Sequence, residues 1–443
     1  MKPAAALTIA GSDSGGGAGI QADLKTFAAF EVHGLCVVTS VTAQNTRGVD
    51  DIFDLPAEIV GNQIDTVIED FDVKWGKTGM VSNSEIIDII KEKTKEHKLN
   101  LVIDPVMKAA RGSSLLDQSA LESLKDFLSV AKLVTPNIDE AAELTGIEIE
   151  TVEDMKDAAE KIKGLGPENV LIKGGHLEEE KIHNVLLYGN NFIEYETSRV
   201  PVSDVHGSGC TFSAAITAEL AKGKNLRNAV KKAGDFMIDA IERRLKIGSG
   251  LESVNPMSNI WKLVSDEKEA ENILKAAKRL IDNPEFVHMI PEVGTNIAMA
   301  PKDAQRKEDV FGLTGRIVKV SGRPYLSGIP APGGSEHMAN LIMSVIKHDH
   351  EYRAAMNIRF SEKILKKCRD LGFEIASFDR ENEPKDVKTM KWGPDKAIEQ
   401  FGKVPDIIYD RGAVGKEPMI RILGKKSTEV TDKALQILKE LDK

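Results

Sequence analysis

The stretch LNLVIDP at residues 99–105 decides the fold class of the first half of this 443-residue chain. A short, largely apolar run ends there at an acidic residue and a proline, and similar runs occur at 35–42 (LCVVTSVT), 132–135 (KLVT) and 169–173 (NVLIK). Short apolar strands that alternate with helical patterns indicate a mostly parallel sheet covered by helices on both faces. We therefore predict a three-layer α/β/α domain over residues 1–257.

Polar residues collect where these predicted strands end. In open α/β sheets, ligands bind beyond the carboxyl ends of the strands. Asn137 and Glu140 follow one strand end and suit a hydrated Mg²⁺ with a triphosphate. Lys173 could reach a phosphate as a point charge, and Asp104 could contact metal or phosphate. Each residue alone could equally be a helix cap or a solvated strand end, but their shared position favours a nucleotide site.

Two glycine-rich loops precede predicted helices. The first, AGSDSGGGAG at 10–19, lacks the Gly-Lys-Ser/Thr ending of a Walker A loop, and alone it could equally be a flexible turn. The second, HGSGCT at 206–211, opens a helix predicted over 208–220. Backbone N–H groups around Gly207 and Gly209, together with the helix N-terminus, predict an anion site for a phosphoryl group. We include Thr211 in this nucleotide-binding set.

Cys210 lies at the positive end of that second helix. A helix N-terminus lowers a thiol pKa, so Cys210 is placed to act as a base or to hydrogen-bond a reacting hydroxyl. The alternative is a small buried hydrophobe in a tight turn, which describes most single cysteines. The flanking glycines favour the functional interpretation.

Composition narrows the possible partners and the compartment. The net charge of −10 disfavours a nucleic-acid partner, which usually requires a basic face. The three cysteines are far apart, so a structural zinc site is not expected, and their sparse, odd number fits a reducing compartment. The sequence has no apolar stretch near the ~18 residues of a membrane span, and its apolar start is too short for a signal peptide. We expect a cytoplasmic protein without membrane contact that forms a homo-oligomer.

The second half carries its own pattern, after a linker expected at about 255–265. Residues 267–281 show a helical apolar face, and Asp266 with Glu269 resembles a capping box. This helix would open a second, smaller α/β domain over 266–443. Its strands are predicted, in order, at 354–360, 373–378, 407–409 and 419–423.

Several segments of this second domain have compositions that suggest a functional role rather than a purely structural one. The Gly/Pro-rich stretch 328–337 runs into a helix predicted over 338–346, and its glycines and serine at a helix start suggest another anion site. Asn357 and Arg359 alternate on one strand and so share a face. The loop 410–418 is rich in charge and glycine. Each could equally be a solvated turn with incidental charge.

The motifs of the first half resemble a known family. The segments AGSDS at 10–14, GGGAGIQAD at 15–23, VTAQNT at 41–46 and HGSGC at 206–210 are similar to the hydroxymethylpyrimidine/phosphomethylpyrimidine kinases of thiamine synthesis, which are ribokinase-like. The resemblance covers about 1–257. It implies ATP-dependent phosphorylation of a pyrimidine alcohol and then of the resulting phosphate, with Mg²⁺ as cofactor.

The same resemblance assigns residues to these steps. It implies that Gln44 pairs with the pyrimidine ring, and an amide does match an aminopyrimidine edge because it offers both donor and acceptor. It implies that Gly11, Asp23 and Met80 line the pyrimidine pocket. Cys210 is assigned to the reaction centre. Nucleotide and Mg²⁺ are assigned to Asn137, Glu140 and Lys173.

The second half resembles the archaeal-type thiamine-phosphate synthase domain, over roughly 267–443. The resemblance rests on Gly315-Arg316, GGSEH at 333–337, Asn357 and RGAVGKEP at 411–418. It implies that the pyrimidine diphosphate is joined to thiazole phosphate, giving thiamine phosphate and pyrophosphate. Arg316 and His337 are expected to be essential, with Arg316 holding phosphate and His337 orienting or protonating its oxygens. Asn357 is expected to bind substrate.

Two alternatives stay open at this point. The first half could be another ribokinase-like enzyme, such as a pyridoxal or sugar kinase, although Gln44 and Cys210 argue against it. The second half could be a non-catalytic sensor that binds thiamine phosphate. A substrate panel and a product assay distinguish these possibilities.

Overall fold

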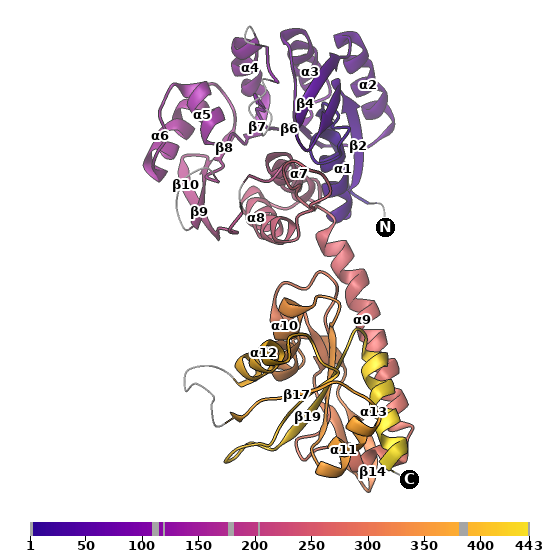
Figure 1. The fold of residues 1–443 in the computed structure, drawn as a ribbon. Coiled ribbons are helices and arrows are strands. Elements are labelled where there is room, and N and C mark those ends of the chain that lie inside the picture. Colours follow the sequence, from indigo (N-terminus) through magenta and orange to yellow (C-terminus); the bar gives the residue numbers. More distant parts are fainter. Residues whose placement is uncertain are drawn as a thin grey trace. The chain divides into compact units, whose positions relative to one another are not determined.

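The computed structural model describes residues 3–108, 115–117, 120–175, 181–202, 204–380 and 389–441, the last range without the side chains of 389–391. The chain divides into two compact units, Met1–Ile260 and Trp261–Lys443. Figure 1 shows that each unit has its own sheet with helices packed against it. Among the described residues, no helix is long and apolar enough to cross a membrane.

The first unit is built on an eight-stranded sheet with the order β10-β9-β8-β7-β6-β5-β1-β2. The strands from β8 to β2 pair in parallel, and the β9–β10 hairpin adds two antiparallel strands at one edge. The strands are β1 (Ala5–Ala10), β2 (His33–Val38), β5 (Trp75–Thr78), β6 (Asn100–Ile103), β7 (Ala131–Val134), β8 (Asn169–Ile172), β9 (Lys181–Tyr188) and β10 (Asn191–Ser198).

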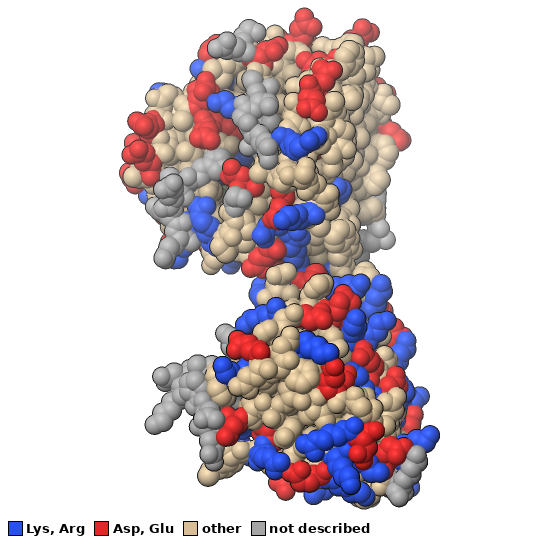
Figure 2. Space-filling view, viewed as in Figure 1, with Lys and Arg blue, Asp and Glu red and all other residues tan. Residues whose placement is uncertain are grey.

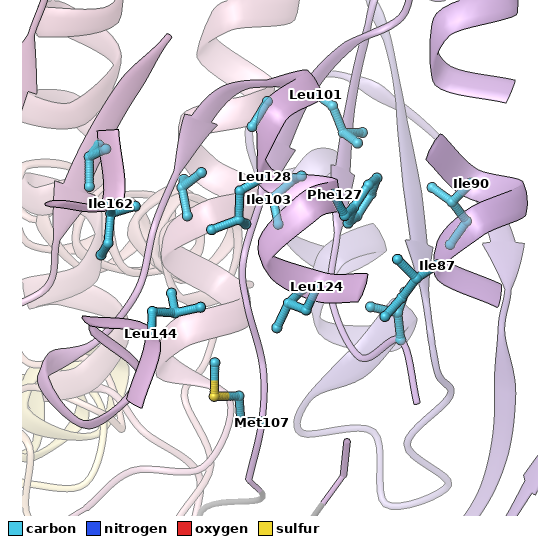
Figure 3. Packing of buried hydrophobic residues seen from close by; sticks show 14 of the residues in the cluster. Ile87, Ile90, Leu101, Ile103, Met107, Leu124, Phe127, Leu128, Leu144 and Ile162 are labelled. Atoms are coloured by element: carbon cyan, nitrogen blue, oxygen red, sulfur yellow. The ribbon is translucent and has the colours of Figure 1, made fainter. Parts of the chain in front are cut away.

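Helices cover both faces of this sheet, because alternate strand residues enter two separate cores. Leu7 packs in one core with helices α2–α6, and its neighbour Ala6 packs in the other with α1, α7 and α8. Figure 3 shows the first core, where Phe127, Leu101 and Ile103 lie among the packed aliphatic side chains. The helices are α1 (Gly19–Ala29), α2 (Ala57–Asp70), α3 (Ser84–Glu96), α4 (Leu121–Phe127), α5 (Ile138–Thr145), α6 (Val152–Lys163), α7 (Ser208–Ala221) and α8 (Leu226–Glu242). The predicted three-layer arrangement is confirmed.

One predicted strand is divided in two. The run 35–42 breaks after β2, and β3 (Ser40–Asn45) pairs instead with β4 (Gly48–Asp54) in a separate two-stranded sheet. Thr39 marks the break: its N–H donates to the Ala10 carbonyl at 3.0 Å, and its hydroxyl donates to the Met80 carbonyl at 2.8 Å. The continuous apolar run therefore gave no sign that the chain leaves the main sheet after β2. Because β3 belongs to a separate sheet, Gln44 lies near the ends of the main strands.

The second unit has a seven-stranded sheet with the order β15-β12-β11-β16-β19-β18-β17, and a separate β13–β14 hairpin. Helices α9, α11 and α13 pack on one face, and α10 and α12 on the other. Figure 2 shows basic and acidic side chains interspersed on the visible face of this unit. The strands are β11 (Ile297–Met299), β12 (Phe311–Leu313), β13 (Arg316–Val320), β14 (Arg323–Ser327), β15 (Pro330–Pro332), β16 (Ala354–Arg359), β17 (Ile375–Ser377), β18 (Ile407–Asp410) and β19 (Met419–Gly424); the helices are α9 (Ser258–Ile281), α10 (Glu336–His348), α11 (Glu362–Asp370), α12 (Thr389–Phe401) and α13 (Ser427–Leu441).

Two expectations for the start of this unit are wrong. The predicted linker at 255–265 is largely helical, because α9 begins at Ser258. Asp266 therefore lies inside the helix and does not cap it. The boundary between the two units falls within α9, between Ile260 and Trp261. The four strands predicted from sequence correspond to β16–β19, whereas β11–β15 were not anticipated.

Candidate active sites

A cavity of about 400 Å³ opens at the carboxyl ends of the parallel strands in the first unit. The two glycine loops and several strand ends meet around it. Its lining includes most of the residues predicted from sequence, namely Gly11, Gln44, Met80, Asp104, Asn137, Glu140, Lys173, Gly207, Gly209 and Cys210. Gly11 and Cys210, which are 199 positions apart, thus line one cavity at the shared strand ends.

The two glycine loops fit together only because they lack side chains. Gly207 has φ +84°, and a Cβ placed on it would lie 1.8 Å from the Gly17 carbonyl oxygen. Gly19 has φ +56°, and its Cβ would lie 2.4 Å from the Gly11 carbonyl oxygen. L-residues rarely adopt this backbone region, and no side-chain rotation relieves a clash with backbone. Glycine is therefore required where the first loop meets the N-terminus of α7.

A polar network crosses from one loop to the other beside the cavity. The Asp13 carboxylate accepts N–H bonds from Gly15, Gly17 and Ala18 at 2.8–2.9 Å and lies 2.8 Å from His206 Nε2. The same ring nitrogen is 3.4 Å from the Gln44 amide nitrogen. The imidazole and these N–H groups hold the pKa of Asp13 below its usual range, despite burial.

This network was only partly anticipated. Asp13 and His206 stand in the quoted motifs, but only Gln44 was assigned to the site from sequence. One signal could have identified them: each glycine-rich loop carries one titratable side chain close to its glycines, a carboxylate in the first loop and an imidazole in the second. Their pairing depends on contact across 193 residues, which periodicity cannot reveal.

The cationic side of the cavity is built around Lys173. Its ammonium lies 2.7 Å from Asp104 and 3.9 Å from Glu140. Asp104 also accepts from the Ser213 hydroxyl at 3.2 Å. Burial raises the pKa of Glu140 to about 7, against the pull of Lys173. Burial lowers the pKa of Lys173, but the two carboxylates outweigh it and leave that pKa raised, so the lysine is charged.

Asn137 and Glu140 also cap α5. The Asn137 side chain accepts from the Glu140 N–H at 2.8 Å, and the Glu140 carboxylate accepts from the Asn137 N–H at 2.7 Å. The structural alternative of a helix cap is therefore correct for both. It does not remove them from the site, since both still line the cavity.

A second cavity of about 300 Å³ adjoins the first. Lys173, Asn137 and Gly209 line both cavities. Its remaining wall combines polar side chains with apolar ones. The polar ones are Asn184, Thr197, Ser198 and Arg199, and the apolar ones are Ile182, Val200, Val202, Phe212, Met237, Ile238 and Ile241. The two cavities therefore meet at the N-terminus of α7.

Cys210 lies on the wall of the first cavity, in the first turn of α7. Burial raises the pKa of its thiol to about 11, and the nearby Lys77 ammonium only partly opposes this effect. The expectation that the helix N-terminus lowers this pKa and favours the thiolate is wrong. The thiol is protonated at neutral pH.

Two residues predicted at the site do not line it. Asp23 is fully buried behind the wall, where its carboxylate accepts from Thr8 at 2.6 Å and pairs with Lys77 at 3.0 Å. Its short carboxylate is committed to this pair, so a direct contact with substrate is not supported. Thr211 is also fully buried, and its hydroxyl has no hydrogen-bond partner among the described residues. It sits one turn into α7 and faces the interior rather than the cavity.

In the second unit, predicted site residues converge on the loop that precedes β11. Arg316 donates to the Val293 carbonyl. The Asn357 amide donates to the Gly294 carbonyl at 2.9 Å and accepts from the Asn296 N–H at 2.7 Å. Three segments far apart in sequence are therefore joined at one end of the sheet.

The other motifs of this unit lie close to the same loop or at the start of α10. Glu417, in the segment 411–418, accepts from the Val293 N–H at 3.2 Å. His337 is exposed in the first turn of α10, and no hydrogen bond of the described residues links it to the loop before β11. The structure thus joins Arg316 with Asn357, but it does not join His337 to them.

Comparisons with known proteins match both units. A family model described as phosphomethylpyrimidine kinase matches residues 13–255, and one described as thiamine-phosphate synthase ThiN matches residues 272–436. The chain is 38% identical over 441 residues to the bifunctional thiamine biosynthesis protein ThiDN of Methanocaldococcus jannaschii, covering 98% of each chain. It is 44% identical to the hydroxymethylpyrimidine/phosphomethylpyrimidine kinase of Bacillus subtilis, covering 55% of this chain and 92% of that protein.

Solved structures resemble the first unit. Bacillus subtilis pyridoxal kinase, in an ADP complex, is 37% identical with a TM-score of 0.55, covering 58% of this chain and 99% of that chain. Staphylococcus aureus pyridoxal kinase, in complex with AMP-PCP and pyridoxal, is 34% identical with a TM-score of 0.54, covering 58% and 95%. These structures agree with the ribokinase-like fold of the first unit. Since a relative also matches end to end, the chain belongs to the family of bifunctional thiamine biosynthesis proteins that carry a phosphomethylpyrimidine kinase domain followed by a thiamine-phosphate synthase domain.

Proposed function

We propose that the first unit transfers phosphoryl groups from ATP to hydroxymethylpyrimidine and then to its phosphate. The second unit joins the resulting diphosphate to thiazole phosphate, which gives thiamine phosphate and pyrophosphate. The observation that carries the kinase proposal is the pair of adjoining cavities that share Lys173, Asn137 and Gly209. A nucleotide in one cavity and an alcohol in the other would meet at these residues.

The pyrimidine is proposed to bind in the cavity lined by Gln44, Gly11 and Met80. The Gln44 amide can pair with an aminopyrimidine edge through one donor and one acceptor. His206 Nε2 lies beside that amide, and the Asp13 carboxylate lies 2.8 Å from the same ring nitrogen. A Cβ on Gly11 would lie 3.1 Å from the Met80 sulfur, so the floor of this cavity is closely packed.

The nucleotide is proposed to bind in the second, adjoining cavity, with its phosphates toward Lys173 and the N-terminus of α7. Backbone N–H groups at a helix start and a lysine ammonium both stabilise phosphate charge, and phosphoryl transfer depends mainly on positioning and charge stabilisation. A Cβ on Gly209 would lie 3.3 Å from the Lys173 ammonium, so the loop and the lysine face the same space.

The residues present fit a Mg²⁺ ion. Mg²⁺ in such sites is bound by one or two carboxylates together with substrate phosphates. Glu140 supplies a buried carboxylate with a raised pKa at the cavity wall, and Asp104 lies on the other side of Lys173. Glu140 would hold the ion, which would neutralise charge on the phosphates.

Cys210 is proposed to position the reacting hydroxyl. With a pKa of about 11, the thiol is a hydrogen-bonding group rather than a preformed base. The hydroxyl oxygen would bond to the γ-phosphorus of ATP as the bond to the leaving ADP breaks, and the hydroxyl proton would pass to a phosphoryl oxygen or to solvent. A neutral thiol can orient the hydroxyl without competing as a nucleophile.

In the second unit, Arg316 and Asn357 are proposed to shape the substrate site, with His337 entering it from α10. Arg316 and Asn357 both bind the backbone of residues 293–296, and so they fix this loop at the end of the sheet. We also keep as predictions that the chain is a cytoplasmic homo-oligomer without a nucleic-acid partner.

One experiment tests the two activities together. The full chain is incubated with hydroxymethylpyrimidine, ATP, Mg²⁺ and thiazole phosphate, and the products are identified by mass spectrometry. Thiamine phosphate and pyrophosphate are expected. Pyridoxal is added in a parallel reaction because the two solved relatives are pyridoxal kinases, and preferred phosphorylation of pyridoxal would contradict the pyrimidine assignment. Tight binding of thiamine phosphate without its formation would make the second unit a sensor.

A further inference from the structure

A buried group of three charged residues lies at one end of the sheet in the second unit. Asp410 ends β18 and is fully buried. Its carboxylate accepts from Arg380 at 2.6 and 3.1 Å and from Arg421 in β19 at 2.7 Å. The side chains of Arg380 and Arg421 are only 10% and 3% exposed. We call these three residues the arginine cluster.

The arginine cluster carries more positive than negative charge. Two guanidinium groups face one carboxylate, and among the described residues no second carboxylate pairs with either arginine, which leaves one positive charge without a counterion there. Arginine stays protonated in proteins. Burial, together with the second guanidinium at Arg380, lowers the pKa of Arg421 against the opposing effect of Asp410. Burying an uncompensated charge costs several kcal/mol, so the cluster is well placed to receive an anion.

The two guanidiniums also have unused donors. Each guanidinium has five N–H groups, and within the described part of the chain only three N–H···O bonds leave Arg380 and Arg421, all to Asp410. The Arg421 guanidinium lies over the Phe378 ring at 5.5 Å, which holds its plane. Guanidiniums with free N–H groups in a fixed plane suit bidentate recognition of phosphate oxygens.

The cluster is continuous with the predicted site residues. Arg421 is the register partner of Asn357 across β19 and β16, so their side chains leave the same face of the sheet. Asn357 binds Gly294 and Asn296, and Arg316 binds Val293 in the same loop. The arginine cluster, Asn357 and the loop before β11 therefore follow one another across neighbouring strands of the sheet.

We propose that Arg380 and Arg421 form the phosphate-binding end of the active site of the second unit. They would take a phosphate or diphosphate group of a substrate, and Asp410 would hold both guanidiniums in place. This inference rests on the proposed synthase function for its kinetic test. Asp410 is a positioning residue, because its oxygens are already engaged by the two arginines and by the Gly412 N–H at 2.9 Å.

The kinetic test uses the full chain without ATP, so that only the second unit reacts. Pyrimidine diphosphate and thiazole phosphate are supplied, and inorganic pyrophosphate and inorganic phosphate are added as inhibitors. Arg421→Lys keeps the charge but loses the planar fork, and Arg380→Gln removes one charge at the rim. Each change should raise the pyrophosphate inhibition constant and the KM of one phosphate-bearing substrate by about tenfold or more, the scale of one charged hydrogen bond. The substrate whose KM rises shows which phosphate group occupies the cluster.

Arg353→Lys is the matched control. Arg353 is a buried arginine of the same unit that pairs with Glu269 at 3.6 Å and donates to the Ala300 carbonyl at 2.6 Å. Its replacement should cost comparable stability, followed by calorimetry, and should leave KM and pyrophosphate inhibition unchanged. If Arg421→Lys and Arg353→Lys alter these constants equally, the cluster is structural and the proposal is wrong.

A binding measurement separates this inference from the synthase function. Calorimetric titration of the full chain with pyrophosphate is made in saturating AMP-PCP, which occupies the nucleotide site of the first unit. Binding that is lost in Arg421→Lys but not in Arg353→Lys supports the anion site even if no thiamine phosphate is formed. Normal synthesis with unchanged pyrophosphate binding in both arginine-cluster variants would refute the site and leave the function intact.

Discussion

Glu140→Gln should make the first unit more stable and less active, and the increase in stability should depend on pH. Burial raises the pKa of Glu140 from 4.5 to about 7. At about 1.4 kcal/mol per pKa unit, the ionised carboxylate costs the folded state on the order of 3 kcal/mol. Glutamine keeps an oxygen that can accept from the Asn137 N–H and removes the charge.

The direction of this pH dependence of stability follows from proton binding. Between pH 4.5 and about 7 the folded chain holds a proton on Glu140 that the unfolded chain has lost, so stability falls as pH rises through this window. The cost is absent below pH 4.5 and fully present above pH 7. Glu140→Gln should therefore stabilise the first unit by about 1–3 kcal/mol at pH 8 and by little at pH 4.5.

Calorimetry of the full chain at several pH values measures this difference. Glu160→Gln is the control: Glu160 lies on α6 of the same unit, is exposed, does not line the cavity and loses the same charge. Kinase turnover should fall in Glu140→Gln, because the proposed Mg²⁺ ligand is lost. A stabilisation that is the same at pH 4.5 and pH 8 would refute the buried-carboxylate reasoning. Unchanged turnover would remove Glu140 from the metal site.

Three further changes test the remaining assignments. Cys210→Ala should lower kinase turnover by at least ~100-fold with little effect on folding. In the unmutated chain, alkylation of the Cys210 thiol should be slow at pH 7 and accelerate toward pH 11. Near-normal turnover of the variant would remove Cys210 from the mechanism. Gln44→Leu should weaken pyrimidine use by ~1–3 kcal/mol and leave ATP affinity nearly unchanged, as measured by the two KM values; equal losses would contradict its placement. Arg316→Ala and His337→Ala should each abolish most ATP-free thiamine phosphate formation while the kinase reaction of the same chain persists, and a variant that still forms product at the normal rate would be withdrawn from the synthase site.

The sequence was sufficient where structure depends on short-range pattern. Largely apolar runs of four or five residues, each followed by polar, proline or glycine residues, predicted β6, β7 and β8, as is typical of buried parallel strands. Glycines before a helix predicted the start of α7. Among the strands that the sequence did not reveal, β11, β12 and β15 have three residues each, too few to show alternation. Length does not explain why β13 and β14, with five residues each, were missed. The break at Thr39 was hidden because both β2 and β3 favour β-branched residues.

Tertiary structure alone decided which charged residues face the cavities. The family resemblance implied Asp23 as a site residue, and its position at a strand end suggested Asp104. In the structure Asp23 is buried and paired with Lys77 and Thr8, whereas Asp104 lines the cavity beside Lys173. The pKa of Cys210 likewise followed from burial, which outweighed the helix terminus visible in the sequence. Residue type and local spacing determined the strands and the glycine loops, because these depend on backbone periodicity and on the lack of a side chain. Partner choice and desolvation depend on residues brought together from distant positions, and only the folded chain fixes them.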